Sequence, residues 1–242
     1  MEIGEFIRIM ESLAPPELAE EWDSEKIGLI VEGRQELEQI CCALDATPET
    51  VGRAVSARAD MLVVHHTPLW TPVTAFRGPL ASLLREAVGS GMNIYVLHTN
   101  YDHAPGGVND VLADLLGLEN TLPLSLGIVG ECGIGIQEIA DRLNSPLRAW
   151  NDPHLPGTLA VVGGSGFSPE LIREAADAGA GSFLSAELRH SVARSSPIPL
   201  LEATHYALEA PAMRALAERM GWTYIEDIPN LLTWTPKSSG SC

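Results

Sequence analysis

The sequence predicts an α/β protein made of two related halves with mostly parallel sheets, on three observations. Short apolar runs alternate with amphipathic stretches of roughly 10 to 15 residues, which is typical of βαβ units. The same order of elements occurs in both halves of the chain. The length of 242 residues is enough to bury the core of one large domain or two small ones.

Residues 1–13 are expected to form an amphipathic helix. Five apolar side chains recur at helical spacing: Ile3, Phe6, Ile7, Met10 and Leu13. This segment lacks the basic start of a signal peptide. No apolar run of the chain approaches the ~20 residues that cross a bilayer. We therefore expect a cytoplasmic protein without a membrane partner.

The elements of the first half follow from apolar runs and helix caps. Strands are expected at residues 40–46, 60–66 and 93–99, and helices at 47–59, 79–91 and 106–118. Thr47 is the expected N-cap of the first of these helices, because its hydroxyl can accept a backbone N–H and Pro48 suits the first helical position.

The second half repeats this pattern. Strands are expected at residues 158–164, 182–188 and 199–205, and helices at 168–180 and 211–221. An offset of 121 residues places His66 on Glu187. An offset of 107 places His98 on His205 and Asp102 on Glu209. Because the two offsets differ, these matches indicate either a duplication or the general likeness of any two βα units.

Charge and cysteine content exclude some classes of function. There are 15 basic and 32 acidic residues, a formal net charge of −17, which disfavours nucleic acid as a partner but can gather cations. Cys41, Cys42, Cys132 and Cys242 form no CxxC pair, so a thiolate-rich zinc site is not expected. Adjacent Cys41 and Cys42 are expected to be reduced core residues, and Cys242 is expected to end a mobile tail.

Histidines stand at the predicted ends of three strands. In open parallel sheets, ligands bind beyond the carboxyl ends of the strands. Carboxylates follow two of the histidines four residues later. The candidate metal ligands are His65, His66, His98, Asp102, His205 and Glu209. Four imidazoles and two carboxylates suit two divalent ions of Zn, Mn, Fe, Co or Ni. The competing interpretation is that the His-His pair merely ends a strand.

The remaining polar motifs are less specific. "GGSGFS", residues 163–168, is either a tight βα turn or a loop whose amides contact phosphate, but it lacks the lysine of a P-loop. Glu187, His190 and His103 are candidates for proton transfer. His154 is expected in a surface turn. A solvated Glu187 paired with Arg189 is the alternative to a catalytic one.

Several motifs together resemble the NIF3-like family, also known as GTP cyclohydrolase 1 type 2 homologues. They are "EEWDSEKIGLIVEG", "VVHHTPLW", "HTNYDHAPGGVNDVLADLLGL", "VVGGSGFS" and "ATHYALEAP", and they span nearly the whole chain. The resemblance implies two interlinked α/β domains, a dinuclear metal centre between them and a homohexameric ring. It carries metal ligation onto the same six residues. We expect residues 1–120 with 200–242 to form the first domain and 121–199 the second.

The sequence departs from the family pattern in three places. Ala186-Glu187 stands where family members often have Gly-Asp, and Ser24 replaces the usual asparagine. Two extra residues separate Trp22-Asp23 from Gly28-Leu29. The chain is also too short for the inserted middle domain of larger relatives. These changes spare the expected ligands and leave the identity of the substrate open.

Two functions are compatible with these residues. The first is a metal-dependent hydrolase that acts on a nucleotide-type small molecule or a phosphoester, with Glu187 as the candidate catalytic residue. The second is a non-catalytic, metal-stabilised ring that serves as a regulatory or protein-interaction scaffold. In the second case the six ligands would serve folding and assembly. Turnover of nucleotides with added metal separates the two.

Overall fold

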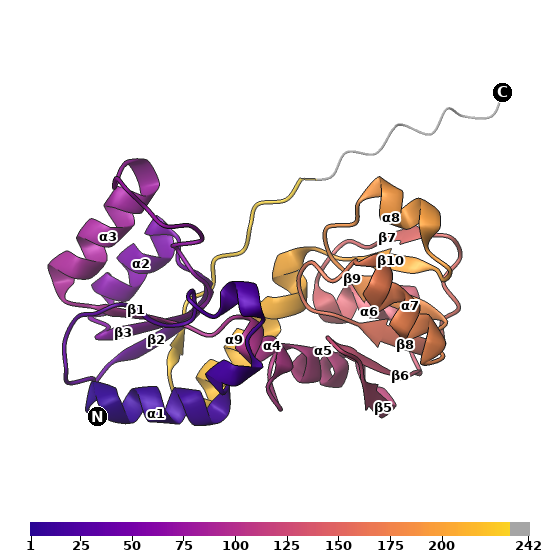
Figure 1. Cartoon of the computed structure of the whole chain (residues 1–242), viewed down its shortest axis with the longest axis horizontal. Helices are drawn as coiled ribbons and strands as arrows, with labels where there is room; N and C mark the ends of the chain where they lie inside the picture. Colours follow the sequence, from indigo (N-terminus) through magenta and orange to yellow (C-terminus); the bar gives the residue numbers. More distant parts are fainter. Residues whose placement is uncertain (233–242) are drawn as a thin grey trace.

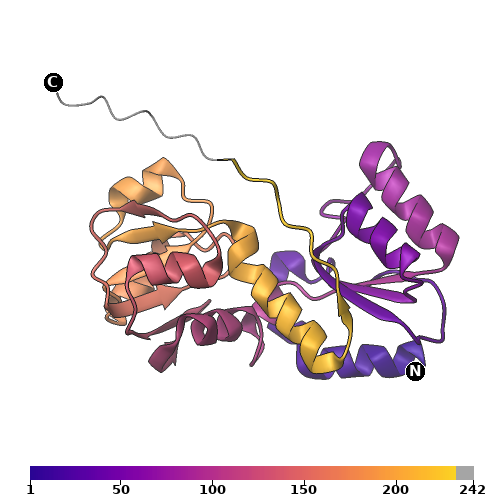
Figure 2. The same cartoon turned by 180° about the vertical axis from the view of Figure 1, so that it is seen from behind.

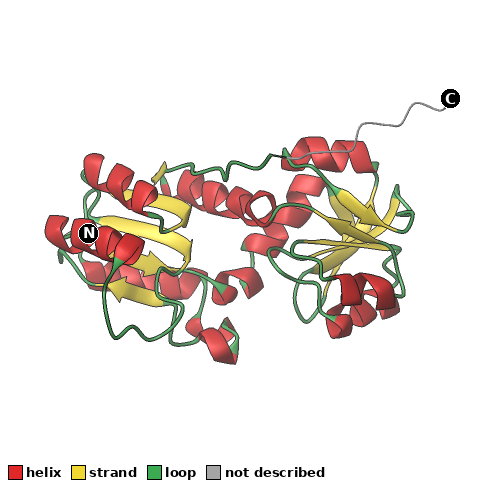
Figure 3. Ribbon diagram, turned by 90° about the horizontal axis from the view of Figure 1, so that it is seen from above, coloured by secondary structure: helices red, strands yellow, loops and turns green. Residues whose placement is uncertain are grey.

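The chain folds into two lobes that lie side by side along its longest axis (Figure 1). The computed structural model describes residues 1–232, so Cys242 and its tail lie outside the described residues. Each lobe contains one β-sheet with helices on both faces, and the sheets stand at opposite ends of the molecule with helices between them (Figure 3). Within residues 1–232, no helix is both long enough and apolar enough to span a membrane.

The first lobe is built on a five-stranded sheet of order β1-β4-β3-β2-β11. Its strands are β1 (Gly28–Val31), β2 (Ile40–Asp45), β3 (Met61–His66), β4 (Asn93–Val96) and β11 (Thr223–Tyr224). All neighbours are parallel except β1, which runs antiparallel to β4. The central strands are buried almost throughout, as expected for a parallel sheet covered on both faces.

Helices cover both faces of this first sheet. The helices of the lobe are α1 (Ile3–Leu13), α2 (Pro48–Ser56) and α3 (Gly78–Ser90). One core joins α2 and α3 to the sheet, and a second core joins α1 to its opposite face. The expected amphipathic face of α1 is confirmed, because Ile3, Phe6 and Met10 are buried. Thr47 caps α2 as expected, since its Oγ1 accepts the backbone N–H of Thr50 at 3.0 Å.

The second lobe is built on a six-stranded sheet of order β5-β6-β8-β9-β10-β7. Its strands are β5 (Leu118–Pro123), β6 (Ile128–Cys132), β7 (Arg148–Trp150), β8 (Gly157–Val161), β9 (Ser182–Ser185) and β10 (Leu200–Glu202). Only β8, β9 and β10 run parallel to one another, so this sheet is mixed. Its helices are α5 (Val108–Leu116), α6 (Ile136–Leu143), α7 (Pro169–Asp177) and α8 (His190–Ser195).

The expected domain limits stay a prediction, but two segments belong to a different sheet from the one that those limits imply. Residues 200–202 form β10 of the second sheet, although we expected them in the first domain. Residues 118–120 likewise begin β5 of the second sheet. Hydrogen bonding to β9 and β7 places β10 there, and local sequence carries no information about that pairing.

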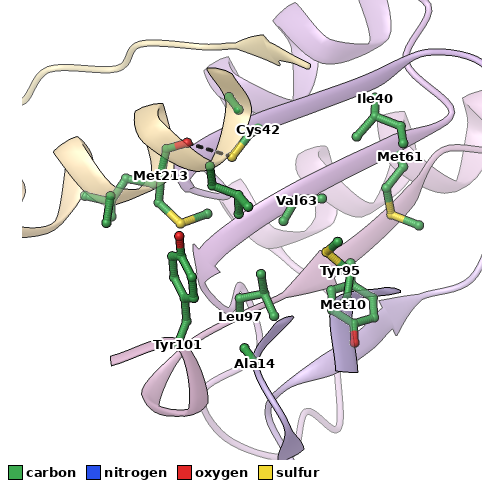
Figure 4. Close-up of a cluster of buried hydrophobic side chains, with 14 of the residues drawn as sticks. Met10, Ala14, Ile40, Cys42, Met61, Val63, Tyr95, Leu97, Tyr101 and Met213 are labelled. Carbon is green, nitrogen blue, oxygen red and sulfur yellow. Dashed lines mark hydrogen bonds between the residues drawn. The ribbon is translucent and has the colours of Figure 1, made fainter. Parts of the chain in front are cut away.

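One long helix, α9 (His205–Met220), connects the lobes (Figure 2). Leu208 packs in the core of the second lobe, whereas Met213 and Leu216 pack in that of the first. In the first core, the carbonyl of Met213 accepts a hydrogen bond from the Cys42 thiol at 3.3 Å (Figure 4). Burial in both cores fixes α9 relative to both sheets.

The predicted start of α9 at Pro211 is wrong, because the helix begins six residues earlier at His205. Thr204 is its N-cap, and the Thr204 Oγ1 accepts the backbone N–H of Ala207 at 3.3 Å. Pro211 therefore lies inside the helix, where its missing N–H costs one helical hydrogen bond. The additional turns carry both His205 and Glu209.

Candidate metal centre

His65 and His66 are the last two residues of β3. Successive side chains of a regular strand point to opposite faces. At this strand end, however, the two ring centroids lie 4.9 Å apart, and both rings offer a ligand atom to one group. The Nδ1 of buried His65 bonds to the Leu97 carbonyl at 2.7 Å, and the Nδ1 of His66 bonds to Asp45 Oδ1 at 2.7 Å. These two bonds fix both rings.

His98 follows β4 and begins the short helix α4 (Thr99–His103). Its Nδ1 lies 2.8 Å from Oδ2 of Asp23, which is completely buried. The same oxygen accepts hydrogen bonds from the backbone N–H and the hydroxyl of Thr99, at 3.1 and 2.6 Å. Asp23 thus holds His98 in one orientation. In the sequence Asp23 stands out only as part of a family motif, because 75 residues separate it from His98.

Helices supply the other candidate ligands. His205 and Glu209 share one face of α9, and His205 Nε2 lies 2.9 Å from Glu209 Oε2. The same carboxylate oxygen lies 3.0 Å from His66 Nε2. From α4, Asp102 places Oδ1 3.5 Å from His65 Nε2. The structure therefore brings together all six residues that the sequence selected as ligands, although their ligand role stays a prediction.

The donor atoms of the six side chains form three overlapping groups, in each of which they lie within 4.8 Å of one another. The groups are His65, His66 and His98; His66, His205 and Glu209; and His65, Asp102 and Glu209. Two of these atoms, His65 Nε2 and Asp102 Oδ1, are buried without a hydrogen-bond partner. An unpartnered buried polar atom costs about 1–3 kcal/mol. Convergent nitrogen and oxygen donors in this state fit bound divalent cations.

Each histidine has its Nδ1 occupied by a neighbour. Asp45, Asp23 and Glu187 accept from His66, His98 and His205 respectively, and a backbone carbonyl accepts from His65. An Nδ1–H donor leaves the lone pair on Nε2, the atom that faces the centre in three of these histidines. Such outer partners fix the tautomer and increase the basicity of a ligating imidazole. This pattern favours Nε2 ligation.

Three histidines of the site differ strongly in their pKa values. Burial lowers the pKa of His65 to about 3, so this ring is neutral. Burial also opposes protonation of His66, but its hydrogen bonds with Asp45 and Glu209 outweigh burial and raise the pKa to about 10. Similar bonds to Glu209 and Glu187 outweigh burial at His205 and raise its pKa to about 8.

The pKa values of the two carboxyl groups of the site, Asp102 and Glu209, shift in opposite directions. Burial and the neighbouring Glu209 charge raise the pKa of Asp102 well above its usual value. Burial also opposes ionisation of Glu209, but His65, His205 and His66 overcome it and lower the pKa of Glu209. The ionised Glu209 carboxylate therefore lies between the protonated rings of His66 and His205.

The glycine-rich segment 163–168 forms a tight turn from β8 to α7. The N–H groups of Gly163 and Gly166 bond to Asn109 Oδ1 and Ser185 Oγ, so they are not free for a phosphate. Gly164 has φ +62°, and a Cβ there would overlap Glu209 Oε1 and lie 3.2 Å from His205 Nε2. The turn interpretation is thus the supported one, and the glycine permits close packing on the candidate metal centre.

The remaining candidates differ in their relation to this centre. Glu187, 61% exposed at its side chain, accepts from His205 Nδ1 at 2.7 Å, and its φ of +63° is rare for a non-glycine residue. It does not pair with Arg189, and its catalytic role stays a prediction. His103 bonds to Glu20 at 3.0 Å beside Asp102. His190 and His154 are exposed, and the structure shows no contact of either with the six ligands.

Family comparison fits this geometry. A family model described as Duf34/NIF3 (NGG1p interacting factor 3) matches residues 1–228. The chain belongs to the Duf34/NIF3 family. The expected family resemblance is thereby confirmed, and so is the α/β fold with two sheets.

Two relatives that share one name align with most of this Duf34/NIF3 chain. A protein of Streptomyces coelicolor named GTP cyclohydrolase 1 type 2 homolog is 35% identical and covers 96% of this chain and 93% of its own length. A Methanocaldococcus jannaschii protein with that name is 30% identical over 90% of this chain and 94% of its own.

Solved structures of Duf34/NIF3 relatives share the fold. Reduced HcgD from Methanocaldococcus jannaschii superposes with a TM-score of 0.80 at 28% identity and covers 93% of this chain and 96% of its own. A Bacillus cereus protein related to NIF3 gives a TM-score of 0.82 at 18% identity, with coverage of 96% and 99%, which shows the fold alone.

Proposed function

We propose that this Duf34/NIF3 protein is a metal-dependent hydrolase that acts on a nucleotide-type substrate and binds two divalent transition-metal ions per chain. The observation that carries the proposal is the convergence of six candidate nitrogen and oxygen ligands, two of which have a buried atom without a hydrogen-bond partner. Six ligands exceed the four that one tetrahedral ion takes. The nucleotide class is supported by the name GTP cyclohydrolase 1 type 2 homolog that relatives carry.

The overlapping groups indicate how the ligands would be divided. Glu209 belongs to two of the three groups, and its two oxygens lie near different histidines. A carboxylate with this position suits a bridging role, with the histidines as terminal ligands. Two bound divalent ions would lower the pKa of a water molecule and offset negative charge on the attacked group.

The residues of the chain supply orientation and charge. Asp23, Asp45 and Glu187 hold three imidazoles by their Nδ1–H groups, so the Nε2 lone pairs stay directed inward. Glu187 is the most exposed of these three carboxylates, because Asp23 is buried and Asp45 is only partly exposed. Of the three, Glu187 can therefore exchange a proton with solvent most readily, as a general base requires.

Glu209→Gln tests the proposal. The amide keeps the shape of the side chain but loses the charge that binds cations, so metal content and nucleotide turnover should both fall. Glu218→Gln is the matched control, because Glu218 is an exposed residue of the same helix. Elemental analysis and turnover of a nucleotide panel with added metal measure both effects. Full metal content in Glu209→Gln would show that Glu209 is not a ligand.

One observation favours the non-catalytic alternative. His65, His66 and His98 belong to the first lobe, whereas the start of α9 packs in the second lobe. Bound metal would therefore connect the two lobes and stabilise their arrangement. Under this alternative, added metal raises the melting temperature, while no nucleotide of the panel is turned over.

A further inference from the structure

Two large aromatic side chains lie exposed beside the candidate metal centre. Trp22 is 57% exposed and Trp70 is 44% exposed. Both contact His98 edge-on, with ring centroids 5.8 Å away for Trp22 and 5.1 Å away for Trp70. Only 5% of the residues in the chain are aromatic, so two exposed indoles at one site are unusual for its surface. Clustered exposed apolar area of this kind marks a binding surface.

The two indoles line one groove. It has a volume of about 490 Å³, and its wall includes Lys26, Leu69 and Val73 in addition to the two tryptophans. Small-molecule sites have volumes of roughly 300–1,000 Å³. One side of the groove comes from the 3₁₀ turn at Glu21–Asp23 and the residues after it, and the other from the loop that follows β3. The groove thus has the size of a small-ligand site.

Local contacts tie both indoles to the candidate metal ligands. Trp22 directly precedes Asp23, which accepts the hydrogen bond from His98. Trp70 lies four residues after His66, and its centroid is 6.1 Å from that ring. The Lys26 ammonium donates to the Trp22 carbonyl at 2.7 Å and lies 4.7 Å from the centroid of the indole, over its ring. Lys26 thus covers part of the Trp22 indole, which stays 57% exposed.

The charges of the site do not favour recognition through phosphate. Within residues 1–232, no lysine or arginine forms a hydrogen bond or ion pair with any of the six candidate ligands. In this part of the chain, Lys26 is the one basic residue that lines the groove, and Glu21 and Glu25 lie beside it. The side chains of the groove therefore offer aromatic faces, and not a cluster of basic groups, for binding a substrate.

We propose that Trp22 and Trp70 form a stacking site for the planar heteroaromatic ring of the substrate, on the His98 side of the metal centre. The inference rests on the proposed function, because the ring is that of the nucleotide-type substrate. Aromatic side chains stack on heteroaromatic rings of any base, because every base has a π-face, and this contact needs no specific hydrogen bond. The chain would bind the substrate mainly through this ring, and the reacting atom of the substrate would face the six candidate ligands.

Titration calorimetry of the metal-loaded full chain with guanosine tests this site. Trp22→Ala and Trp70→Ala should each weaken guanosine binding by about tenfold or more, in line with the loss of one stacking partner. Trp70→Phe should retain most of the affinity, because it keeps an aromatic face. Phe76→Ala is the matched control, since Phe76 is 62% exposed in the same loop and does not line the groove.

Two further measurements complete the design. Metal content of each variant is determined, because both indoles contact His98 and a lost ion would mimic a lost stacking site. Ribose 5-phosphate serves as the probe without a ring, and its heat of binding should be the same in the wild type and the tryptophan variants. Guanosine binding that depends on both tryptophans at unchanged metal content supports the stacking site.

The outcomes separate this inference from the proposed function. Equal guanosine affinity in wild type, Trp22→Ala and Trp70→Ala overturns the stacking site, and so does a wild type that binds no guanosine. Turnover of nucleotides by the wild type keeps the hydrolase proposal in either case. Tryptophan-dependent binding without any turnover leaves the stacking site and removes the hydrolase. A change of oligomeric mass in Trp70→Ala with unchanged guanosine affinity identifies an interface between copies and overturns the inference.

Discussion

Asp23→Ala should weaken metal binding although Asp23 is not among the candidate ligands. Oδ2 of this buried carboxylate accepts hydrogen bonds from His98 Nδ1, the Thr99 amide and the Thr99 hydroxyl. Loss of an outer partner of a ligating histidine typically costs 10- to 100-fold in metal affinity. At about 1 kcal/mol per bond, the three lost bonds also remove about 3 kcal/mol from the free energy of unfolding.

Two comparison variants separate positioning from general instability. Asp60 accepts from the amides of Glu38 and Gln39 and pairs with Arg34, away from the metal centre, so Asp60→Ala should cost similar stability without loss of metal affinity. Asp45→Ala removes a single bond, the one to His66, so it should also weaken metal binding but should lower the free energy of unfolding by only about 1 kcal/mol. Urea unfolding of the metal-free protein and competition with a chelator measure the two quantities. Wild-type metal affinity in Asp23→Ala would refute the positioning role.

Three further predictions follow from the same geometry. Gly164→Ala should displace Glu209 and lower metal content, whereas Gly179→Ala, with a similar positive φ but open space around its Cβ, should keep it; equal metal content by elemental analysis contradicts the packing argument. Glu187→Gln should keep its metal, because the amide oxygen can still accept from His205 Nδ1, but should lower turnover by ~10²–10⁴-fold, as for a lost general base. Unchanged turnover limits Glu187 to holding His205. At pH 7 the raised pKa values of His66, about 10, and His205, about 8, keep both rings protonated without metal, so metal loading should release at least the protons of these two rings and should tighten as pH rises. Calorimetry in buffers of different ionisation enthalpy measures the released protons, and heats that are the same in all buffers contradict this assignment.

The sequence by itself determined the features that depend on local order. Alternating apolar runs predicted most strands and helices, and the cap at Thr47 forms as expected. The six candidate ligands could be selected because strand ends and a four-residue helical spacing are visible along the chain. The parallel strands β3 and β4 then bring His65, His66 and His98 to the same edge of the first sheet.

Tertiary structure decided which partners hold these ligands. Asp23 lies 75 residues from His98, and Leu97 lies 32 residues from His65, so no local pattern could pair them. The strand order of the second sheet and the start of α9 depended in the same way on distant contacts. The exposed indoles of Trp22 and Trp70 both contact His98, although the two tryptophans come from separate segments of the chain. Spacing along a chain sets which side chains share a face, but packing between segments sets which faces meet.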